Sequence, residues 1–461
     1  MKKFLRLIQG IHLGLGCLLF TFGAQAQIKP EEILTILKTN GVNPSEVTME
    51  IRQKDKVVFG LNEKMQLIPA SVTKIFTTFA VLKQIPFNYK FKTELYFDDK
   101  NIYVKGGGDP AFVSENMWYL VNEFKRQGIS HIPGDIILDD SLFDEIRYDQ
   151  SRESKRIDRS YDAPVGALSF NWNSVNIYIK PEAGKVQAYV DPESNYFTLR
   201  NTAKVSKKPK DLILSIDQDS QVITVSGELS SLAPEKAYFK NVSDPIKWFG
   251  ENLKSFLNQR GVSIKGKIKP GKVPASARLV ATNESKTLSA ILSDMNKFSN
   301  NFVAEMLTKN LAAYSGEAPA KLSTGVGLIK SELRKLNLID KDLVLLNPSG
   351  FSRDNKFSAH ALTEVLAYIQ TDFKIYPSFV DSLPLAGYDG TLKKRMKDSA
   401  AEGYVRAKTG YLDGVVSLAG YAAKKPLAQN DVYAFTFIYN GAKDEAAVRA
   451  TFDKILNHIL N

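Results

Sequence analysis

Two changes of pattern, near residues 90 and 275, restrict the fold of this chain more than any other feature of its sequence. Between them, short runs rich in β-branched and aromatic residues alternate with turn residues, and one amphipathic helix is predicted at 114–126. Before and after this block, apolar residues recur at helical spacing, with a few strands among them. Because 461 residues exceed what a single hydrophobic core organises, the sequence predicts one domain of strands and helices that is split by a mainly β insertion.

Periodicity also predicts the individual elements. Gly106, Gly107 and Gly108 lack the Gly-Lys-Ser/Thr ending of a phosphate-binding loop, so we interpret them as a tight turn. Inside the block, strands are expected at 91–97, 101–104, 132–138, 176–179, 186–190, 196–199, 212–216 and 222–225. Outside it, we expect a β-hairpin at 47–59, helices at 288–295, 301–312, 323–336 and 360–370, and antiparallel strands at 404–408, 415–422 and 432–439 before a C-terminal helix.

Ser71 and Lys74 lie three residues apart at the start of a predicted amphipathic helix, whose apolar face includes Ile75, Phe79 and Leu82. Residues i and i+3 share one face of a helix, so the Lys74 amine can reach the Ser71 hydroxyl. A serine needs an adjacent base to act as a nucleophile, and an amine can be that base where burial or a second cation lowers its pKa. Taken alone, the pair favours an ordinary surface helix, but two motifs far downstream reverse that interpretation.

The downstream motifs supply further polar groups. Lys408, Thr409 and Gly410 end a predicted strand, where the lysine can bind a carboxylate or polarise a hydroxyl, and the glycine lets a substrate backbone lie close. Ser299 and Asn301 form a Ser-x-Asn pattern at a predicted helix start. Ser-x-Asn also occurs elsewhere in the chain, and a glycine after a strand is common, so each motif is weak by itself.

In their order along the chain, the motifs resemble those of the penicilloyl-serine transferases, which include penicillin-binding proteins and serine β-lactamases: Ser71-x-x-Lys74, Ser299-x-Asn301 and Lys408-Thr409-Gly410. Four further segments resemble the D-alanyl-D-alanine carboxypeptidase/endopeptidase family, the class C low-molecular-mass penicillin-binding proteins: 69–74, 162–169, 347–353 and 385–392. Ser71 and Ser299 are 228 residues apart (299 minus 71), which agrees with the large insertion of this family and far exceeds the serine β-lactamases. Asn300 and the pair Asn347-Pro348 depart from the residues that many members carry.

The resemblance implies a fold of the β-lactamase/transpeptidase type and a role for each motif residue. Ser71 would attack the D-Ala-D-Ala carbonyl and form an acyl-enzyme, with Lys74 as its base. Lys408 would lie near Lys74, and two adjacent ammonium groups would lower one pKa. The resemblance also implies that Ser299 relays a proton to the leaving amine and that Asn301 forms a hydrogen bond with the substrate backbone. Lys408 and Thr409 would bind the carboxylate of the peptide or of a penicillin. The backbone amides of Ser71 and Tyr411 would form an oxyanion hole.

The N-terminus has the pattern of an export signal. Lys2 and Lys3 precede an apolar run, and Ala24-Gln25-Ala26 matches a cleavage site. We therefore expect cleavage after Ala26 and a periplasmic mature chain of 435 residues (461 minus 26). A lipoprotein signal at Cys17, the only cysteine, fits its flanking residues less well, and cleavage after Ala26 would leave no cysteine.

Composition narrows the classes of partner. The formal net charge is +11, or +8 without the three charges of the expected signal, which indicates an ordinary basic surface that could also approach a membrane as a peripheral protein. The chain lacks zinc-finger cysteines and an RNA-binding aromatic pattern, so we expect no nucleic acid, no metal and no cofactor. The expected ligands are peptidoglycan peptides and β-lactams, and the oligomeric state is left open.

The expected limits are 1–26 for the signal peptide, 27–90 and 276–461 for the two parts of the transpeptidase-like domain, and 91–275 for the insertion. The expected function is that of a serine D,D-peptidase of peptidoglycan that trims terminal D-Ala, cleaves D,D-crosslinks, or does both. Two alternatives stay open: a serine β-lactamase or esterase of the same superfamily, and a cell-wall binding protein without activity. Fast turnover of penicillin would support the first, and failure to acylate would support the second.

Overall fold

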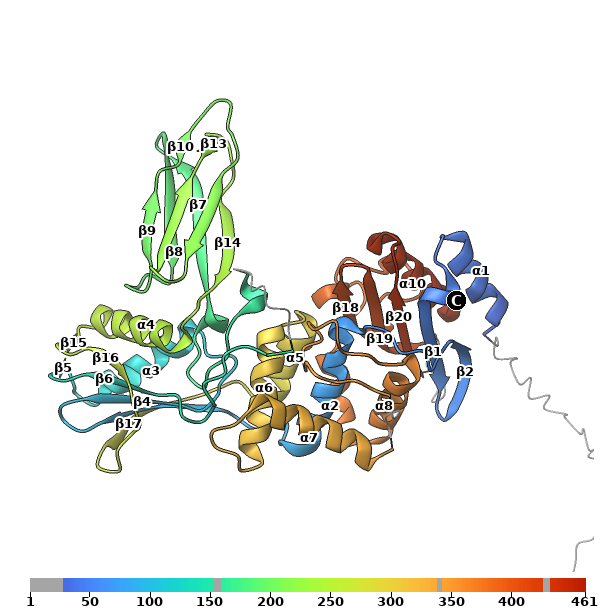
Figure 1. The fold of residues 1–461 in the computed structure, drawn as a ribbon, viewed down its shortest axis with the longest axis horizontal. Coiled ribbons are helices and arrows are strands. Elements are labelled where there is room, and N and C mark those ends of the chain that lie inside the picture. The colour runs from blue at the N-terminus through green and yellow to red at the C-terminus, as the bar shows by residue number, and fades with distance from the viewer. Residues whose placement is uncertain (1–27, 152–158, 338–341, 426–431) are drawn as a thin grey trace, which may run out of the picture.

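The computed structural model describes residues 28–151, 159–337, 342–425 and 432–461. In Figure 1, a main domain made from both ends of the chain stands beside an insertion made from its middle. The predicted fold, an α/β domain with an antiparallel sheet flanked by helices and a mainly β insertion, is confirmed. The predicted signal peptide at 1–26 lies outside the described residues.

The main domain is organised around one antiparallel sheet with the strand order β18-β19-β20-β1-β2. The pairing of β1 with β20 joins the first and last strands of the chain. Both faces of β19 and β20 are covered, and these strands are buried along almost their whole length. The strands are β1 (Val47–Gln53), β2 (Lys56–Leu61), β18 (Val405–Leu412), β19 (Val415–Ala423) and β20 (Val432–Asn440), of which β1 and β2 are the predicted hairpin.

Helices cover both faces of this sheet (Figure 1). The N-terminal and C-terminal helices share a core with one face, and the remaining helices share a core with the other. Central among these is α6, which is buried along almost all of its length. The helices are α1 (Pro30–Thr39), α2 (Lys74–Gln84), α5 (Leu288–Lys297), α6 (Asn301–Tyr314), α7 (Leu322–Lys335), α8 (Ala359–Thr371), α9 (Tyr376–Ser382) and α10 (Glu445–Leu460); the sequence does not predict α1 and α9.

The lower part of the insertion in Figure 1 is a mixed sheet with the order β16-β6-β4-β3-β17, against which α3 and α4 pack. Although α4 was not predicted, its start carries a clear signal: Asp244 accepts hydrogen bonds from two backbone amides, and Pro245 follows it. The last strand, β17, lies beyond the predicted limit at 275. The elements are β3 (Lys92–Phe97), β4 (Ile102–Gly106), α3 (Ser114–Arg126), β5 (His131–Ile132), β6 (Ile136–Asp139), α4 (Pro245–Gln259), β15 (Ser263–Ile264), β16 (Ile268–Pro270) and β17 (Arg278–Glu284).

The upper part of the insertion consists of small sheets that stand away from the mixed sheet (Figure 1). One has the order β14-β7-β8, a second has the order β11-β12-β9, and a third pairs β10 with β13. The strands are β7 (Ser174–Glu182), β8 (Lys185–Asp191), β9 (Thr198–Asn201), β10 (Lys204–Val205), β11 (Ile213–Asp217), β12 (Val222–Ser226), β13 (Glu228–Leu229) and β14 (Lys236–Asn241).

The glycine-rich segment at 106–108 lies where the insertion contacts α6 of the main domain. The interpretation of this segment as a tight turn was wrong. β4 ends at Gly106, and the chain then continues without a turn at the next two residues. A Cβ on Gly107 would lie 2.0 Å from the Lys92 carbonyl oxygen. The side chain of Asn310, from α6, donates a 2.8 Å hydrogen bond to the Gly108 carbonyl. The glycines therefore allow the backbone of the insertion to pack tightly against its own sheet and against α6.

Candidate active site

Ser71 lies in a single 3₁₀ turn, Ala70–Thr73, which leads directly into α2. Ala70 has a left-handed backbone with φ +51°, a conformation that costs free energy for a residue other than glycine. Gly350 packs on the same turn, because a Cβ there would lie 2.0 Å from the Ala70 carbonyl oxygen. Ser71 is partly exposed, whereas the residues that follow it are buried. The turn thus presents one hydroxyl at the surface of a rigid core.

Lys74, at the first position of α2, is fully buried and points back toward Ser71. Its Nζ lies 3.1 Å from Ser71 Oγ, and it donates to Asn301 Oδ1 at 2.8 Å and to the Ser349 carbonyl oxygen at 2.6 Å. Burial lowers the pKa of Lys74 to about 7, against an opposing effect of the Glu305 carboxylate. We expected Lys408 to lower this pKa, but burial is the cause. An amine with this pKa can accept a proton from Ser71 at neutral pH.

Lys408, on β18, is the second fully buried amine of the site. Its Nζ donates to Ser299 Oγ at 2.8 Å and to the Thr409 carbonyl oxygen at 2.7 Å. Burial holds the pKa of Lys408 well below its usual range, and the charge of Lys74 adds to this effect. The two amines therefore resist being protonated together.

Ser299 and Asn301 flank the start of α6. Ser299 has a left-handed backbone with φ +55°, and Asn300 caps the helix by accepting a hydrogen bond from the Val303 amide. The Asn301 side chain accepts from Lys74 through its oxygen, while its nitrogen points to the Tyr161 carbonyl oxygen at 3.4 Å. The three motifs therefore converge, with Asn301 bonded to Lys74 and Ser299 bonded to Lys408.

Gly410 allows β18 to pack closely against β19 and against the turn that carries Ser71. A Cβ at this position would lie 2.1 Å from Ser417 Oγ, 2.9 Å from the Pro69 carbonyl oxygen and 3.0 Å from the Ser71 amide nitrogen. Ser417 Oγ also donates a 2.6 Å hydrogen bond to the Pro69 carbonyl. The absence of a side chain thus allows β18 and β19 to hold the turn that carries Ser71, whereas we had expected it to make room for a substrate backbone.

Thr409 and Tyr411 lie in the C-terminal half of β18, which continues to Leu412 and so extends past the predicted end at 408. The Thr409 hydroxyl shares a 2.8 Å hydrogen bond with the Thr391 hydroxyl. The Tyr411 side chain is half exposed, and the Arg449 guanidinium lies 5.5 Å from the centre of its ring. Thr409 and Tyr411 therefore border the open side of the site, next to the buried Lys408.

Sequence reasoning missed two neighbours of Lys74. The first is the backbone carbonyl of Ser349, which gives no signal through its side chain. The second is Glu305, a buried carboxylate on α6, which accepts a 3.2 Å hydrogen bond from Ser349 Oγ. Glu305 follows Asn301 by four residues and so shares its helix face, and an acidic residue within an otherwise apolar run was a usable signal.

A groove of about 710 Å³ opens beside Ser299 and Asn301. It runs between the main domain and the insertion, and its lining includes partly exposed aromatic side chains. These aromatic residues are Tyr161, Trp172, Phe239 and Phe298. The groove continues the site on the side of α6 and offers space for a ligand much larger than a dipeptide.

Two properties of the described ranges, 28–151, 159–337, 342–425 and 432–461, concern metal ions and membranes. No group of three or more His, Cys, Asp or Glu side chains there could hold a metal ion. No helix in these ranges is long and apolar enough to cross a membrane.

Comparison with known proteins identifies the family. Residues 36–459 match the profile of the D-Ala-D-Ala carboxypeptidase 3 (S13) family. The chain belongs to this family. It is 30% identical over 403 residues to the D-alanyl-D-alanine carboxypeptidase of Actinomadura sp. (strain R39), a match that covers 82% of this chain and 74% of the relative. It is 26% identical over 426 residues to the D-alanyl-D-alanine carboxypeptidase DacB of Haemophilus influenzae, covering 88% and 87% of the two chains.

Solved structures show the same fold. Penicillin-binding protein 4 (dacB) of H. influenzae has a TM-score of 0.79 at 23% identity, and the match covers 93% of this chain and 99% of that one. The predatory endopeptidase Bd0816 of Bdellovibrio bacteriovorus has a TM-score of 0.54 at 15% identity, with 90% and 94% covered. The predicted family and the predicted enzyme class, a serine-type D-Ala-D-Ala carboxypeptidase, are confirmed by the family match.

Proposed function

We propose that this member of the S13 family acts on peptidoglycan through an acyl-enzyme at Ser71, and that penicillins acylate the same serine. The observation that carries the proposal is the position of Lys74. Its Nζ lies 3.1 Å from Ser71 Oγ, its two other partners are neutral oxygens, and its pKa is lowered to about 7. A neutral amine is therefore available beside the nucleophile at physiological pH.

The proposed acylation moves one proton across the site. Lys74 takes the hydroxyl proton as Ser71 Oγ bonds to the carbonyl carbon, and the backbone amides of Ser71 and Tyr411 stabilise the oxyanion. The bond to the leaving amine then breaks. Ser299 gives its hydroxyl proton to that nitrogen and takes up the proton held by Lys74, so both groups return to their starting forms. Water later hydrolyses the ester and regenerates Ser71.

Lys408 and Thr409 would bind the carboxylate of the peptide or of a penicillin. In the free site burial holds the pKa of Lys408 low, because Ser299 Oγ and the Thr409 carbonyl are neutral partners. A substrate carboxylate would supply the missing opposite charge and restore the ammonium form. Substrate binding would thereby charge Lys408 and further favour the neutral form of Lys74.

The groove supports cleavage of crosslinked peptides in addition to removal of terminal D-Ala. Trp172 lines it and is held by a turn in which three successive residues, Asn171 to Asn173, have left-handed backbones. Asn171 Oδ1 accepts from the Ser114 amide at 3.1 Å, and Asn173 Nδ2 donates to the Pro164 carbonyl at 2.8 Å. Such a turn persists only where its surroundings fix it, so Trp172 offers a rigid aromatic surface to a large substrate.

Cleavage assays can test this part of the proposal. We expect Trp172→Ala to slow cleavage of crosslinked muropeptides at least about fivefold, as the loss of about 1 kcal/mol of aromatic contact implies, and to spare a diacetyl-Lys-D-Ala-D-Ala peptide. Trp118, an exposed tryptophan on α3 that does not line the groove, provides the control variant Trp118→Ala. Equal losses on both substrates would contradict an extended binding groove.

We also propose a periplasmic location, with contact to the membrane limited to its surface. The export pattern at 1–26 and the excess of positive charge support this. Fractionation of cells by osmotic shock, followed by a salt wash of the membranes, tests it. Retention of the full-length chain in the cytoplasm would contradict the proposal.

The central experiment is labelling of the purified chain with a fluorescent penicillin, read by denaturing gel and intact mass, beside Ser71→Ala and Lys74→Ala. A lasting one-to-one adduct on wild type that is absent from Ser71→Ala supports the proposal. Rapid release of hydrolysed penicillin would favour a β-lactamase. An intact penicillin and no adduct would favour a binding protein without activity.

A further inference from the structure

The segment 140–151, here called the strap, crosses from the insertion to the main domain. It begins where β6 ends at Asp139 and lies along the segment before α7. Phe143 pairs with Ala320 as an isolated bridge, and the Ala320 amide donates to the Leu142 carbonyl at 2.8 Å. The strap therefore reaches the main domain through backbone contacts as well as through its side chains.

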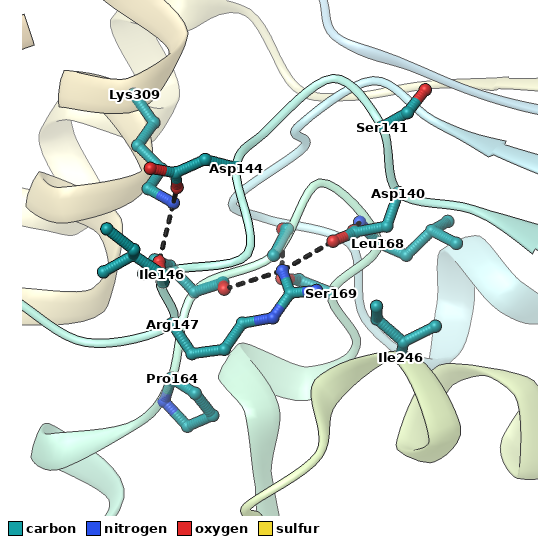
Figure 2. A network of polar contacts seen from close by, with 12 residues as sticks. Asp140, Ser141, Asp144, Ile146, Arg147, Pro164, Leu168, Ser169, Ile246 and Lys309 are labelled. Atoms are coloured by element: carbon teal, nitrogen blue, oxygen red, sulfur yellow. Dashed lines mark hydrogen bonds and ion pairs between the residues drawn. The ribbon is translucent and has the colours of Figure 1, made fainter. Parts of the chain in front are cut away.

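Charged side chains fix the first part of the strap, as Figure 2 shows. Lys309, a buried residue of α6, donates to Asp144 Oδ1 at 2.5 Å and to the Ile146 carbonyl at 2.8 Å. Arg147 donates to Asp140 Oδ2 at 2.6 Å, within the strap itself. Because these groups are largely buried and paired, this part of the strap has one well-defined position on α6.

The last part of the strap reaches the loop 347–352, which contains Ser349, the carbonyl partner of Lys74. Asp149, which is buried, accepts a hydrogen bond from Asn347 Nδ2 through Oδ2 and one from the Ser151 amide through Oδ1. Ser352 Oγ donates to the Ser151 carbonyl at 2.9 Å. The strap is thus bonded to both ends of the segment 347–352.

Asn347 is the centre of this loop. Its Oδ1 accepts from the Ser349 amide at 3.1 Å and from the Phe351 amide at 2.8 Å. Ser349 Oγ lies 2.8 Å from the same oxygen and shares its one proton between Asn347 Oδ1 and Glu305. The carbonyl of Ser349 in turn accepts from Lys74 at 2.6 Å. A continuous chain of buried hydrogen bonds therefore runs from Asp149 through Asn347 and Ser349 to Lys74.

The chemistry of the two side chains determines the direction of this chain. A carboxylate only accepts, so Asp149 must face the NH₂ group of Asn347. The amide oxygen of Asn347 is then forced toward Ser349 and Phe351, where two backbone amides need an acceptor. If the Asn347 amide rotated by half a turn, its NH₂ group would face those donors, and its oxygen would face a carboxylate.

We propose that Asp149, a residue of the insertion, is a positioning residue for acylation, because it orients Asn347 and thereby the Ser349 carbonyl that holds Lys74 beside Ser71. The inference rests on the proposed function of Ser71 and Lys74. It gives the insertion a role in the chemistry itself, in addition to its role in lining the groove. It also explains how a segment more than 70 residues along the chain from Lys74 contributes to the placement of the amine.

The decisive test exchanges the two side chains. Asn347→Asp places two carboxylates against each other, and we expect it to slow acylation by penicillin about 10- to 100-fold, the range that a displacement of about 1 Å at a catalytic group can cause. The double variant Asp149→Asn with Asn347→Asp restores one donor facing one carboxylate and conserves the net charge. In it, the carboxylate at 347 still accepts from Ser349 and Phe351, so we expect acylation to return close to the wild-type rate.

The readout separates positioning from stability. Stopped-flow labelling gives the noncovalent dissociation constant and the acylation rate constant separately. We expect Asn347→Asp to lower the acylation rate constant. Asp144→Asn is the matched control, since it weakens the other anchor of the same strap. We expect it to lower the melting temperature and to leave the acylation rate constant of the folded protein unchanged.

Three results would overturn the inference: wild-type acylation by Asn347→Asp, a folded double variant that stays slow, or equal slowing by Asp144→Asn. Should Asn347→Asp fail to fold, Asp149→Ala against the double variant decides the same question, because only the latter retains the hydrogen bond. Failure of the wild-type protein itself to acylate would contradict the proposed function, which is a separate outcome.

Discussion

Lys74 and Lys309 are both fully buried lysines, one in the candidate active site and one at the junction of α6 with the strap, and their partners differ. Lys74 contacts a hydroxyl, an amide oxygen and a backbone carbonyl, all neutral. Lys309 contacts the Asp144 carboxylate and a backbone carbonyl, and it lies over the Phe143 ring. Burial lowers the pKa of both amines, but a directly bonded carboxylate opposes this only at Lys309.

The comparison shows that burial alone does not identify a catalytic lysine. A buried amine becomes a base when its partners are neutral, because the protonated form then lacks an opposite charge. The same amine paired with a carboxylate stays charged and becomes an anchor, whose removal leaves a buried charge behind. The two lysines should therefore respond to substitution in opposite ways.

The largest effect is expected at the active site. Lys74→Met removes the base beside Ser71, and we expect the acylation rate constant to fall by at least about 10³-fold. The melting temperature should stay constant or rise, because a buried amine with neutral partners gives way to an apolar side chain of similar length. Labelling with fluorescent penicillin and thermal unfolding of the same sample measure both. A large loss of stability would show that Lys74 is also a structural anchor.

At the junction of α6 with the strap, we expect a loss of stability and an almost unchanged acylation rate. Lys309→Met leaves the Asp144 carboxylate largely buried without its cation, and we expect the free energy of unfolding to fall by about 3–5 kcal/mol. The folded fraction should still acylate at close to the wild-type rate, because Asp149 and Asn347 are untouched. Urea titration and single-turnover labelling at a temperature well below the transition check this. If acylation collapses in folded protein, the two lysines are not separable in function.

A smaller change in the acylation rate is expected where β18 holds the Ser71 turn. Gly410→Ala would bring a Cβ within 3.0 Å of Ser417 Oγ, the Pro69 carbonyl and the Ser71 amide. The turn must shift, and we expect acylation to slow about 10- to 100-fold. Gly327→Ala is the control: a Cβ there meets nothing within 4 Å, and alanine should stabilise α7 by about 0.5–1 kcal/mol. Unchanged acylation in Gly410→Ala would show that the turn tolerates displacement.

Much of this arrangement could be predicted from the sequence, because it depends on local patterns. The placement of Ser71 beside Lys74 follows from helix geometry, and the order of the three motifs indicates the family. Most strands and helices follow from periodicity, whereas α4 was missed although Asp244 and Pro245 mark its start. The β-rich composition of the surrounding residues favoured strands in this region, although Asp244 and Pro245 form a clear helix-capping signal.

The parts that could not be predicted depend on backbone groups and on long-range pairing. The Ser349 carbonyl holds Lys74, but a carbonyl is present at every residue and leaves no mark in a sequence. The pairing of Asp149 with Asn347 joins residues 198 apart in sequence. Gly410 was read correctly as a site of close approach, yet only the structure shows that the neighbour is the turn of Ser71.

The smallest effect concerns the pH dependence that separates the two lysines. Acylation requires neutral Lys74, whose pKa is about 7, so the rate constant should rise about tenfold per pH unit below that value and level off above it. The Glu305 carboxylate raises this pKa while burial lowers it. Glu305→Gln removes the negative charge, so the midpoint should move to lower pH, whereas Asp144→Asn should leave it in place because that carboxylate faces Lys309. Rate constants for penicillin labelling from pH 5 to 9 measure the midpoints; a shift to higher pH in Glu305→Gln would mean that a group other than Lys74 limits the reaction.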